Sequence, residues 1–160
     1  MSAVDVSGLN HISFTVSDLD RSVDFFETAC GFEVLSRGPR DSAVAERVTG
    51  VKGADIVVAF LRGPGVVMEL IEYVGPADRG AVMSRPCDVG FAHLALNVGD
   101  FDAALARARG YGLTPMGDVC AVDRGPNKGR QICYLRTWDS ITLEFIEDTP
   151  DAEPGAGAKS

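Results

Sequence analysis

The sequence has few of the features that mark nucleic-acid-binding, membrane or secreted proteins. Its 160 residues contain only 15 Lys and Arg against 23 Asp and Glu, a net charge of −8. An acidic chain of this kind has no basic surface for nucleic acid or anionic membranes. No apolar run reaches the roughly 18 residues that a membrane span needs. Residues 1–5 have no basic segment followed by a long apolar one, so we expect no secretory signal.

The four cysteines are too widely spaced for the usual cysteine-based sites. Cys30, Cys87, Cys120 and Cys133 form no C-x-x-C pair, and their spacing matches no zinc-ribbon pattern. We therefore expect four reduced thiols, which is the usual state of cysteine in a cytoplasmic protein.

The two histidines of the chain lie at equivalent places in an internal repeat. Segment 11–24, HISFTVSDLDRSVD, aligns with segment 93–106, HLALNVGDFDAALA. Further along, segment 68–72, MELIE, aligns with segment 143–147, LEFIE. Each half therefore begins with a histidine-bearing segment and ends with a glutamate-bearing one, which indicates two copies of one structural unit.

The apolar patterning predicts the order β-α-β-β-β in each half. In the first half we expect strands at 10–16, 32–36, 55–62 and 66–73, with a helix over 19–30. In the second we expect strands at 92–98, 118–122, 131–136 and 141–147, with a helix over 100–109. The predicted organisation is a first module over 8–74, a linker over 75–90, a second module over 91–148 and a disordered tail over 149–160. The predicted fold class is α+β, and we expect the two βαβββ modules to pair in a curved, cleft-like mixed sheet.

Strand alternation places four repeated polar residues on the sheet face that the predicted helices do not cover. They are His11, Glu69, His93 and Glu144. Glu72 and Glu147 lie three residues further on, hence on the opposite face, and we expect them to be solvent-facing or capping residues. Two imidazoles and two carboxylates on one sheet face suit Zn, Ni, Co, Fe or Mn, so the sequence predicts one divalent metal ion per site.

The segments LNHISFTVSDLDRSVDFFETACGF, VVMELIEY, FAHLALNV and ITLEFIE resemble the vicinal oxygen chelate superfamily over residues 8–148. This group includes glyoxalase I, methylmalonyl-CoA epimerase, extradiol dioxygenases, fosfomycin-modifying enzymes and bleomycin-binding proteins. The resemblance places the metal ligands at His11, Glu69, His93 and Glu144 and implies a small-molecule substrate. It implies a lyase or isomerase, epimerase-like or glyoxalase-like, in which the metal polarises a substrate oxygen and Glu144 or Glu69 moves a proton.

Two other functions within the superfamily stay open. An Fe(II)-dependent ring-cleaving dioxygenase usually needs two histidines and one carboxylate, so the additional Glu69 favours proton transfer. A non-catalytic antibiotic-binding resistance protein typically lacks the metal ligands, and the complete set of four argues against it.

Several further residues are candidates for the surroundings of the site. The long loop over 36–54 is a candidate cover for it. Candidate anion contacts are Arg37, Arg40, Arg47 and Lys52, together with Asn127, Lys128 and Arg130, and candidate apolar lining residues are Phe60, Tyr73, Met116 and Tyr134. The edge strands of modules this small predict a homodimer with two sites.

Overall fold

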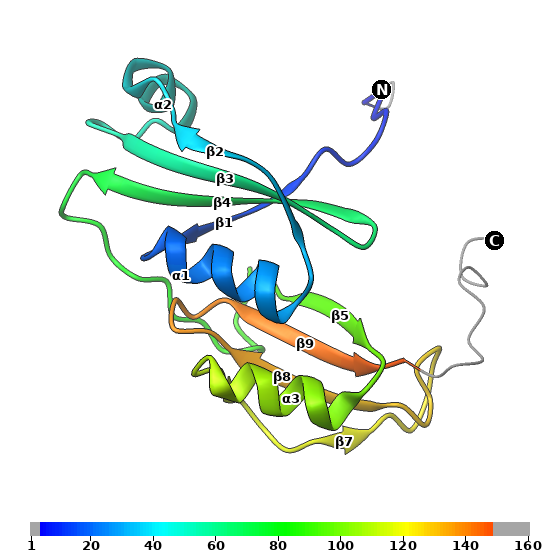
Figure 1. Cartoon of the computed structure of the whole chain (residues 1–160). Helices are drawn as coiled ribbons and strands as arrows, with labels where there is room; N and C mark the ends of the chain where they lie inside the picture. The colour runs from blue at the N-terminus through cyan, green and yellow to red at the C-terminus, as the bar shows by residue number, and fades with distance from the viewer. Residues whose placement is uncertain (1–3, 149–160) are drawn as a thin grey trace. The chain divides into compact units, whose positions relative to one another are not determined.

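The computed structural model describes residues 4–148, and the chain divides into two compact units at Gly80 and Ala81. Each unit contains its own mixed sheet with few helices, as Figure 1 shows. In both units a first strand leads into a helix and then into the remaining strands. The predicted α+β class, built from two βαβββ modules, is therefore confirmed.

The first unit has four strands in the order β1-β4-β3-β2. Its elements are β1 (Ile12–Val16), α1 (Leu19–Asp24), a π-helical turn η1 (Phe25–Ala29), β2 (Glu33–Pro39), α2 (Ser42–Thr49), β3 (Asp55–Gly63) and β4 (Val66–Gly75). Strand β1 lies parallel to β4, whereas β3 is antiparallel to both β4 and β2. The parallel pair needs a crossover connection, which α1 begins.

Helix α1 is held on one face of this sheet by polar and apolar contacts. Asp18 caps the helix by accepting a hydrogen bond from the Arg21 amide, and Glu72 of β4 accepts one from the Leu19 amide at 2.8 Å. The apolar side of α1 is buried, as are Met68 and Leu70 of β4. The prediction that Glu72 lies on the helix side of the sheet as a capping residue is therefore confirmed.

The prediction of one long loop over 36–54 is wrong. Strand β2 continues to Pro39, and α2 occupies the middle of the segment, between its Asp41 N-cap and the left-handed Gly50. Helix α2 packs through Ala45 in a cluster on the sheet face that also carries Glu69. The other members of this cluster are Ala54, Ile56 and Val58, with Val51, Phe60, Ile71 and Tyr73 packed against them. That face is therefore partly covered by a helix, contrary to the expectation that helices leave it free.

The second unit repeats this topology with a shorter middle. Its elements are β5 (Leu94–Val98), α3 (Phe101–Gly110), β6 (Thr114–Pro115), β7 (Cys120–Ala121), β8 (Gln131–Arg136) and β9 (Thr142–Glu147). The order is β5-β9-β8-β6, with β7 also paired to β8, so two short strands replace the single one predicted at 118–122. Asp100 caps α3 as Asp18 caps α1, by accepting a hydrogen bond from the Ala103 amide.

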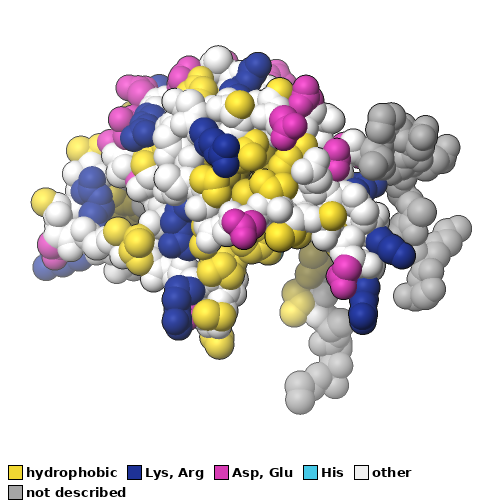
Figure 2. All heavy atoms as spheres, turned by 90° about the horizontal axis from the view of Figure 1, so that it is seen from below, with side chains coloured by type: hydrophobic (Ala, Val, Ile, Leu, Met, Phe, Trp, Pro, Cys, Tyr) yellow, Lys and Arg dark blue, Asp and Glu magenta, His cyan; other side chains and the backbone are white. Residues whose placement is uncertain are grey.

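The charge distribution agrees with the acidic composition. Figure 2 shows basic and acidic side chains interspersed on the face seen from below, with no continuous basic area among the described residues there. No helix within residues 4–148 is long and apolar enough to cross a membrane. The tail predicted over 149–160 lies outside the described residues.

We predict that Gly63→Ala destabilises the first unit. A Cβ atom at Gly63 would overlap the ring of Phe32, which is buried and packs against Phe26 with the ring centroids 5.4 Å apart. Displacing a buried ring costs about 1–3 kcal/mol, and urea unfolding measures this loss. The control is Gly38→Ala, because a Cβ atom at Gly38 meets nothing within 4 Å. Equal losses in both variants would contradict the prediction.

We also predict that the cysteines differ in reactivity toward a maleimide. Burial raises the pKa of the Cys133 thiol, whereas Cys87 and Cys120 are exposed. Because the thiolate is the reacting form, Cys133 is expected to react only after unfolding. Peptide mass spectrometry with and without urea measures this, and native labelling of Cys133 as fast as that of Cys120 would refute it.

Candidate functional site

In the first unit, His11 and Glu69 form an imidazole–carboxylate pair. His11 directly precedes β1, and Glu69 lies in β4 opposite Ser13. The His11 Nε2 atom is 3.4 Å from the Glu69 Oε2 atom, with the side chains 35% and 16% exposed. The histidine therefore remains accessible, while the carboxylate is largely shielded from water.

The orientation of His11 is set by the residue before it. The His11 Nδ1 atom lies 2.6 Å from the Asn10 Oδ1 atom. The Asn10 oxygen can only accept a hydrogen bond, so an Nδ1–H group of the ring makes this contact. A ring nitrogen held in this way by a second residue is typical of histidines that bind metals through the other nitrogen.

In the second unit, His93 and Glu144 form the same pair on the same backbone geometry. His93 directly precedes β5, and Glu144 lies in β9 opposite Ala95, as Glu69 lies opposite Ser13. The His93 Nε2 atom is 3.1 Å from the Glu144 Oε2 atom, with the side chains 33% and 14% exposed. The internal repeat therefore extends to the register of the strands and to the contact between the two side chains.

An aromatic residue from the neighbouring strand packs against each histidine. Phe60, opposite Glu69, meets His11 edge-on with the ring centroids 5.6 Å apart. Tyr134, opposite Glu144, lies 5.0 Å from His93, whose other aromatic neighbour is Phe91 at 6.0 Å. Phe60 therefore lies beside the His11–Glu69 pair, and Tyr134 lies beside the His93–Glu144 pair.

The two aromatic positions differ by one hydroxyl group. Burial, and secondarily the negative charge of Glu144, raise the pKa of Tyr134 above its usual value. Its phenol therefore stays protonated at neutral pH and is available as a hydrogen-bond donor. Phe60 offers no such group.

The other two candidate lining residues have different surroundings. Tyr73 packs in the cluster beneath α2, and the Met116 sulfur accepts a hydrogen bond from the Thr142 hydroxyl at 3.7 Å. Glu147, on the opposite face from Glu144, accepts a hydrogen bond from the Gln131 amide at 3.0 Å. This contact gives Glu147 a structural role comparable to that of Glu72.

Three of the arginines predicted as anion contacts have different partners in the structure. Arg37 forms an ion pair with Asp20 at 2.5 Å, and Arg130 lies 3.9 Å from Asp148. The Arg40 guanidinium lies over the Phe60 ring, 5.8 Å from its centroid. Of these three, Arg40 is the one that shares a neighbour with His11.

A cavity of about 290 Å³ lies beside Asn10, and neither His11 nor Glu69 is among its lining residues. Its lining comes from the turn between β3 and β4 and from the residues before β1: Leu9, Asn10, Arg62, Gly63, Gly65, Val66 and Val67. Asn10 belongs both to this lining and to the support of His11. The cavity is close in size to the lower end of small-molecule sites.

Each unit brings together two of the four predicted ligands. Within residues 4–148 no three His, Cys, Asp or Glu side chains gather in a group that could hold a metal ion. The donor types of each pair, a neutral imidazole and a carboxylate, fit a divalent transition metal. The site with all four ligands stays a prediction.

The sequence reasoning missed two neighbours of the histidines. Asn10 supports His11, and Phe91 packs on His93. Asn10 directly precedes its histidine, and Phe91 lies two residues before the other. Their closeness to the histidines in the sequence could have marked both residues as candidate neighbours. The alternation of polar and apolar residues along the strands did not.

Sequence comparison relates this chain to several known proteins. The family model "Glyoxalase/Bleomycin resistance protein/Dioxygenase superfamily" matches residues 8–145. A 2-epi-5-epi-valiolone epimerase of an Actinomyces species is 34% identical over 143 residues, covering 86% of this chain and 78% of the relative. A lactoylglutathione lyase of Arabidopsis thaliana is 28% identical over 90% of this chain, which spans 45% of that protein.

Solved structures show the same fold. A glyoxalase family protein from Bacillus cereus superposes with a TM-score of 0.78 at 23% identity, over 92% of this chain and 97% of the other. The fosfomycin resistance protein FosX from Listeria monocytogenes, complexed with Mn(II), superposes with a TM-score of 0.58 at 16% identity, over 91% and 96%. The match of the family model over nearly the whole chain, together with the 34% identical relative, shows that this protein belongs to the Glyoxalase/Bleomycin resistance protein/Dioxygenase superfamily.

Proposed function

We propose that this chain is a divalent-metal-dependent lyase or isomerase that moves a proton next to a carbonyl group of a small molecule. The observation that carries the proposal is the imidazole–carboxylate pair built twice, at 3.4 and 3.1 Å, on the same strand register. The names of two relatives, an epimerase and a lactoylglutathione lyase, support this reaction class.

We assign His11, Glu69, His93 and Glu144 as the metal ligands. When bound, a divalent metal supplies positive charge that stabilises negative charge on a substrate oxygen. The bound Mn(II) in the FosX structure supports a metal of this kind for the superfamily. Zn, Ni, Co, Mn and Fe all suit the donor set.

The chain's own residues carry the proton. The Glu144 carboxylate, or that of Glu69, accepts a proton from the carbon beside the carbonyl and returns it to the substrate. Both carboxylates are largely shielded from water, which strengthens their electrostatic interactions with a bound substrate. The Tyr134 phenol stays protonated opposite Glu144 and is free to donate a hydrogen bond to a bound substrate.

The homodimer and the cytoplasmic location belong to the same proposal. Strands β1 and β5 each have one hydrogen-bonded neighbour in their own sheet, so each leaves one edge for a further partner. No disulfide occurs among the described cysteines, in keeping with a reducing compartment.

Metal analysis tests the ligand set. We expect the purified full-length protein to bind one divalent ion per site, and His11→Ala or His93→Ala to weaken binding by roughly 100-fold or more, because each removes a direct ligand. The matched controls are Glu72→Gln and Glu147→Gln, since both carboxylates bond backbone amides on the opposite sheet face. A His11→Ala protein that keeps its full metal content would contradict the four-ligand site.

Deuterium exchange from solvent tests the reaction class. Metal-loaded protein should exchange the proton beside the carbonyl in candidate ketones under nitrogen, and Glu144→Gln should slow this by about 10²–10⁴-fold. The control is Glu147→Gln, which leaves Glu144 in place. Strict dependence on oxygen would indicate a dioxygenase, and tight binding without exchange would indicate a binding protein.

A further inference from the structure

Arg136 lies on the sheet face that carries Glu144, although no candidate role was assigned to it. In the β8–β9 register, Tyr134 is opposite Glu144 and Arg136 is opposite Thr142. Side chains two residues apart on a strand leave the same face about 7 Å apart. Arg136 is therefore the next side chain along β8 after Tyr134, which packs against His93.

Arg136 is partly buried and has no counter-ion among the described residues. Its Nη2 atom donates to the Ser84 carbonyl oxygen at 2.5 Å, while its buried Nε atom has no acceptor in the described part of the chain. No described carboxylate forms an ion pair with it. Burying a cation without an anion is unfavourable, so this position suits an anion brought by a ligand.

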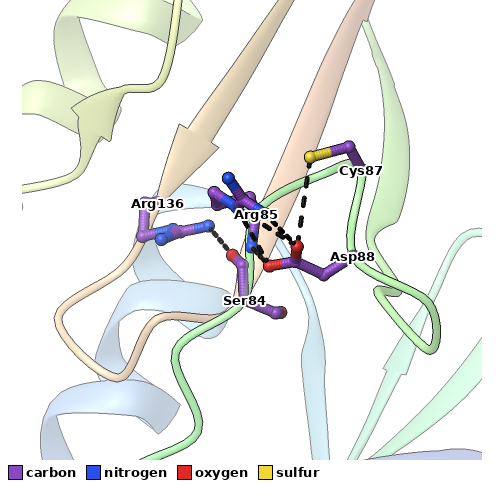
Figure 3. A network of polar contacts seen from close by, with 5 residues as sticks. All are labelled: Ser84, Arg85, Cys87, Asp88 and Arg136. Carbon is purple, nitrogen blue, oxygen red and sulfur yellow. Dashed lines mark hydrogen bonds and ion pairs between the residues drawn. The ribbon is translucent and has the colours of Figure 1, made fainter.

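Arg85, in the same unit, has the counter-ion that Arg136 lacks among the described residues. Arg85 binds Asp88 through Nη2 at 2.7 Å and through Nε at 3.1 Å, as Figure 3 shows. These hydrogen bonds lower the pKa of Asp88 and raise that of Arg85. Arg136 appears in the same figure with the Ser84 carbonyl as its partner, and a carbonyl carries no compensating charge.

We propose that Arg136 binds an anionic group of the substrate, a carboxylate or a phosphate, while the reacting carbon lies at Glu144. The inference rests on the proposed function for the reaction and adds the substrate class: a carbonyl compound that carries an oxyanion. A guanidinium matches the planar geometry of such groups and forms charge-assisted hydrogen bonds with them. The tie to Ser84 holds the side chain in place and leaves four of the five N–H donors of the arginine without a described partner.

Titration with inorganic phosphate, followed by calorimetry on the full-length protein at equal metal content, tests the anion site directly. We expect Arg136→Gln to weaken phosphate binding about tenfold or more, as for loss of a charge-assisted hydrogen bond, and Arg136→Lys to weaken it less. The matched control is Arg124→Gln, which removes the same charge from a side chain 91% exposed in the same unit. No phosphate binding by the unaltered protein, or equal binding by Arg136→Gln, would overturn the proposal.

Two ketones that differ by one carboxylate separate anion recognition from a merely structural role. We expect deuterium exchange into 4-oxocyclohexanecarboxylate to have a higher kcat/KM than exchange into cyclohexanone. Arg136→Gln should remove this preference by raising KM for the acid far more than KM for cyclohexanone. Equal losses with both ketones would show that Arg136 acts only by holding Ser84, and would refute its role in recognition. If neither ketone exchanges, the proposed reaction fails for these compounds, and the phosphate titration alone decides the role of Arg136.

Discussion

The parallel pairing of the first and last strand is the constraint on which each unit depends. It places Ser13 opposite Glu69 and Ala95 opposite Glu144, and so brings a histidine next to a glutamate that is far away in the sequence. A register shift of one residue would move each glutamate to the other face of its sheet. Both histidine–glutamate contacts therefore depend on the register of the parallel strands. The crossover helix makes a parallel pair possible.

Strands β4 and β9 each carry two glutamates whose side chains have different roles on the two faces of the sheet. On the helix side of β4, Glu72 binds the first amide of α1, and on the other side Glu69 faces His11. In β9, Glu147 binds the amide of Gln131, while Glu144 faces His93. Alternation along the strand thus separates carboxylates that stabilise the fold from carboxylates that face a histidine.

The sequence predicts those features that depend on regular alternation. The strand over 131–136 and both His–Glu pairs follow from it, because each strand has a buried and a polar face. Helix α2 was missed because Ala45 is its single buried residue, while Val44 and Val48 are exposed, so its apolar pattern is weak. The role of Arg136 was missed for another reason. Alternation gives the face of a side chain, whereas charge compensation depends on which groups the loops bring near it.

The difference between Phe60 and Tyr134 has a consequence for how such a chain can diversify. In an assembly of two identical single modules, any substitution appears twice, and the two aromatic positions must remain alike. Fusing two copies into one polypeptide removes that symmetry, because each position then mutates independently. The histidine–glutamate pair is the same in both halves, while one half carries a phenol beside it and the other a plain ring. A duplicated chain can therefore repeat its metal-ligand candidates and still surround each pair with different side chains.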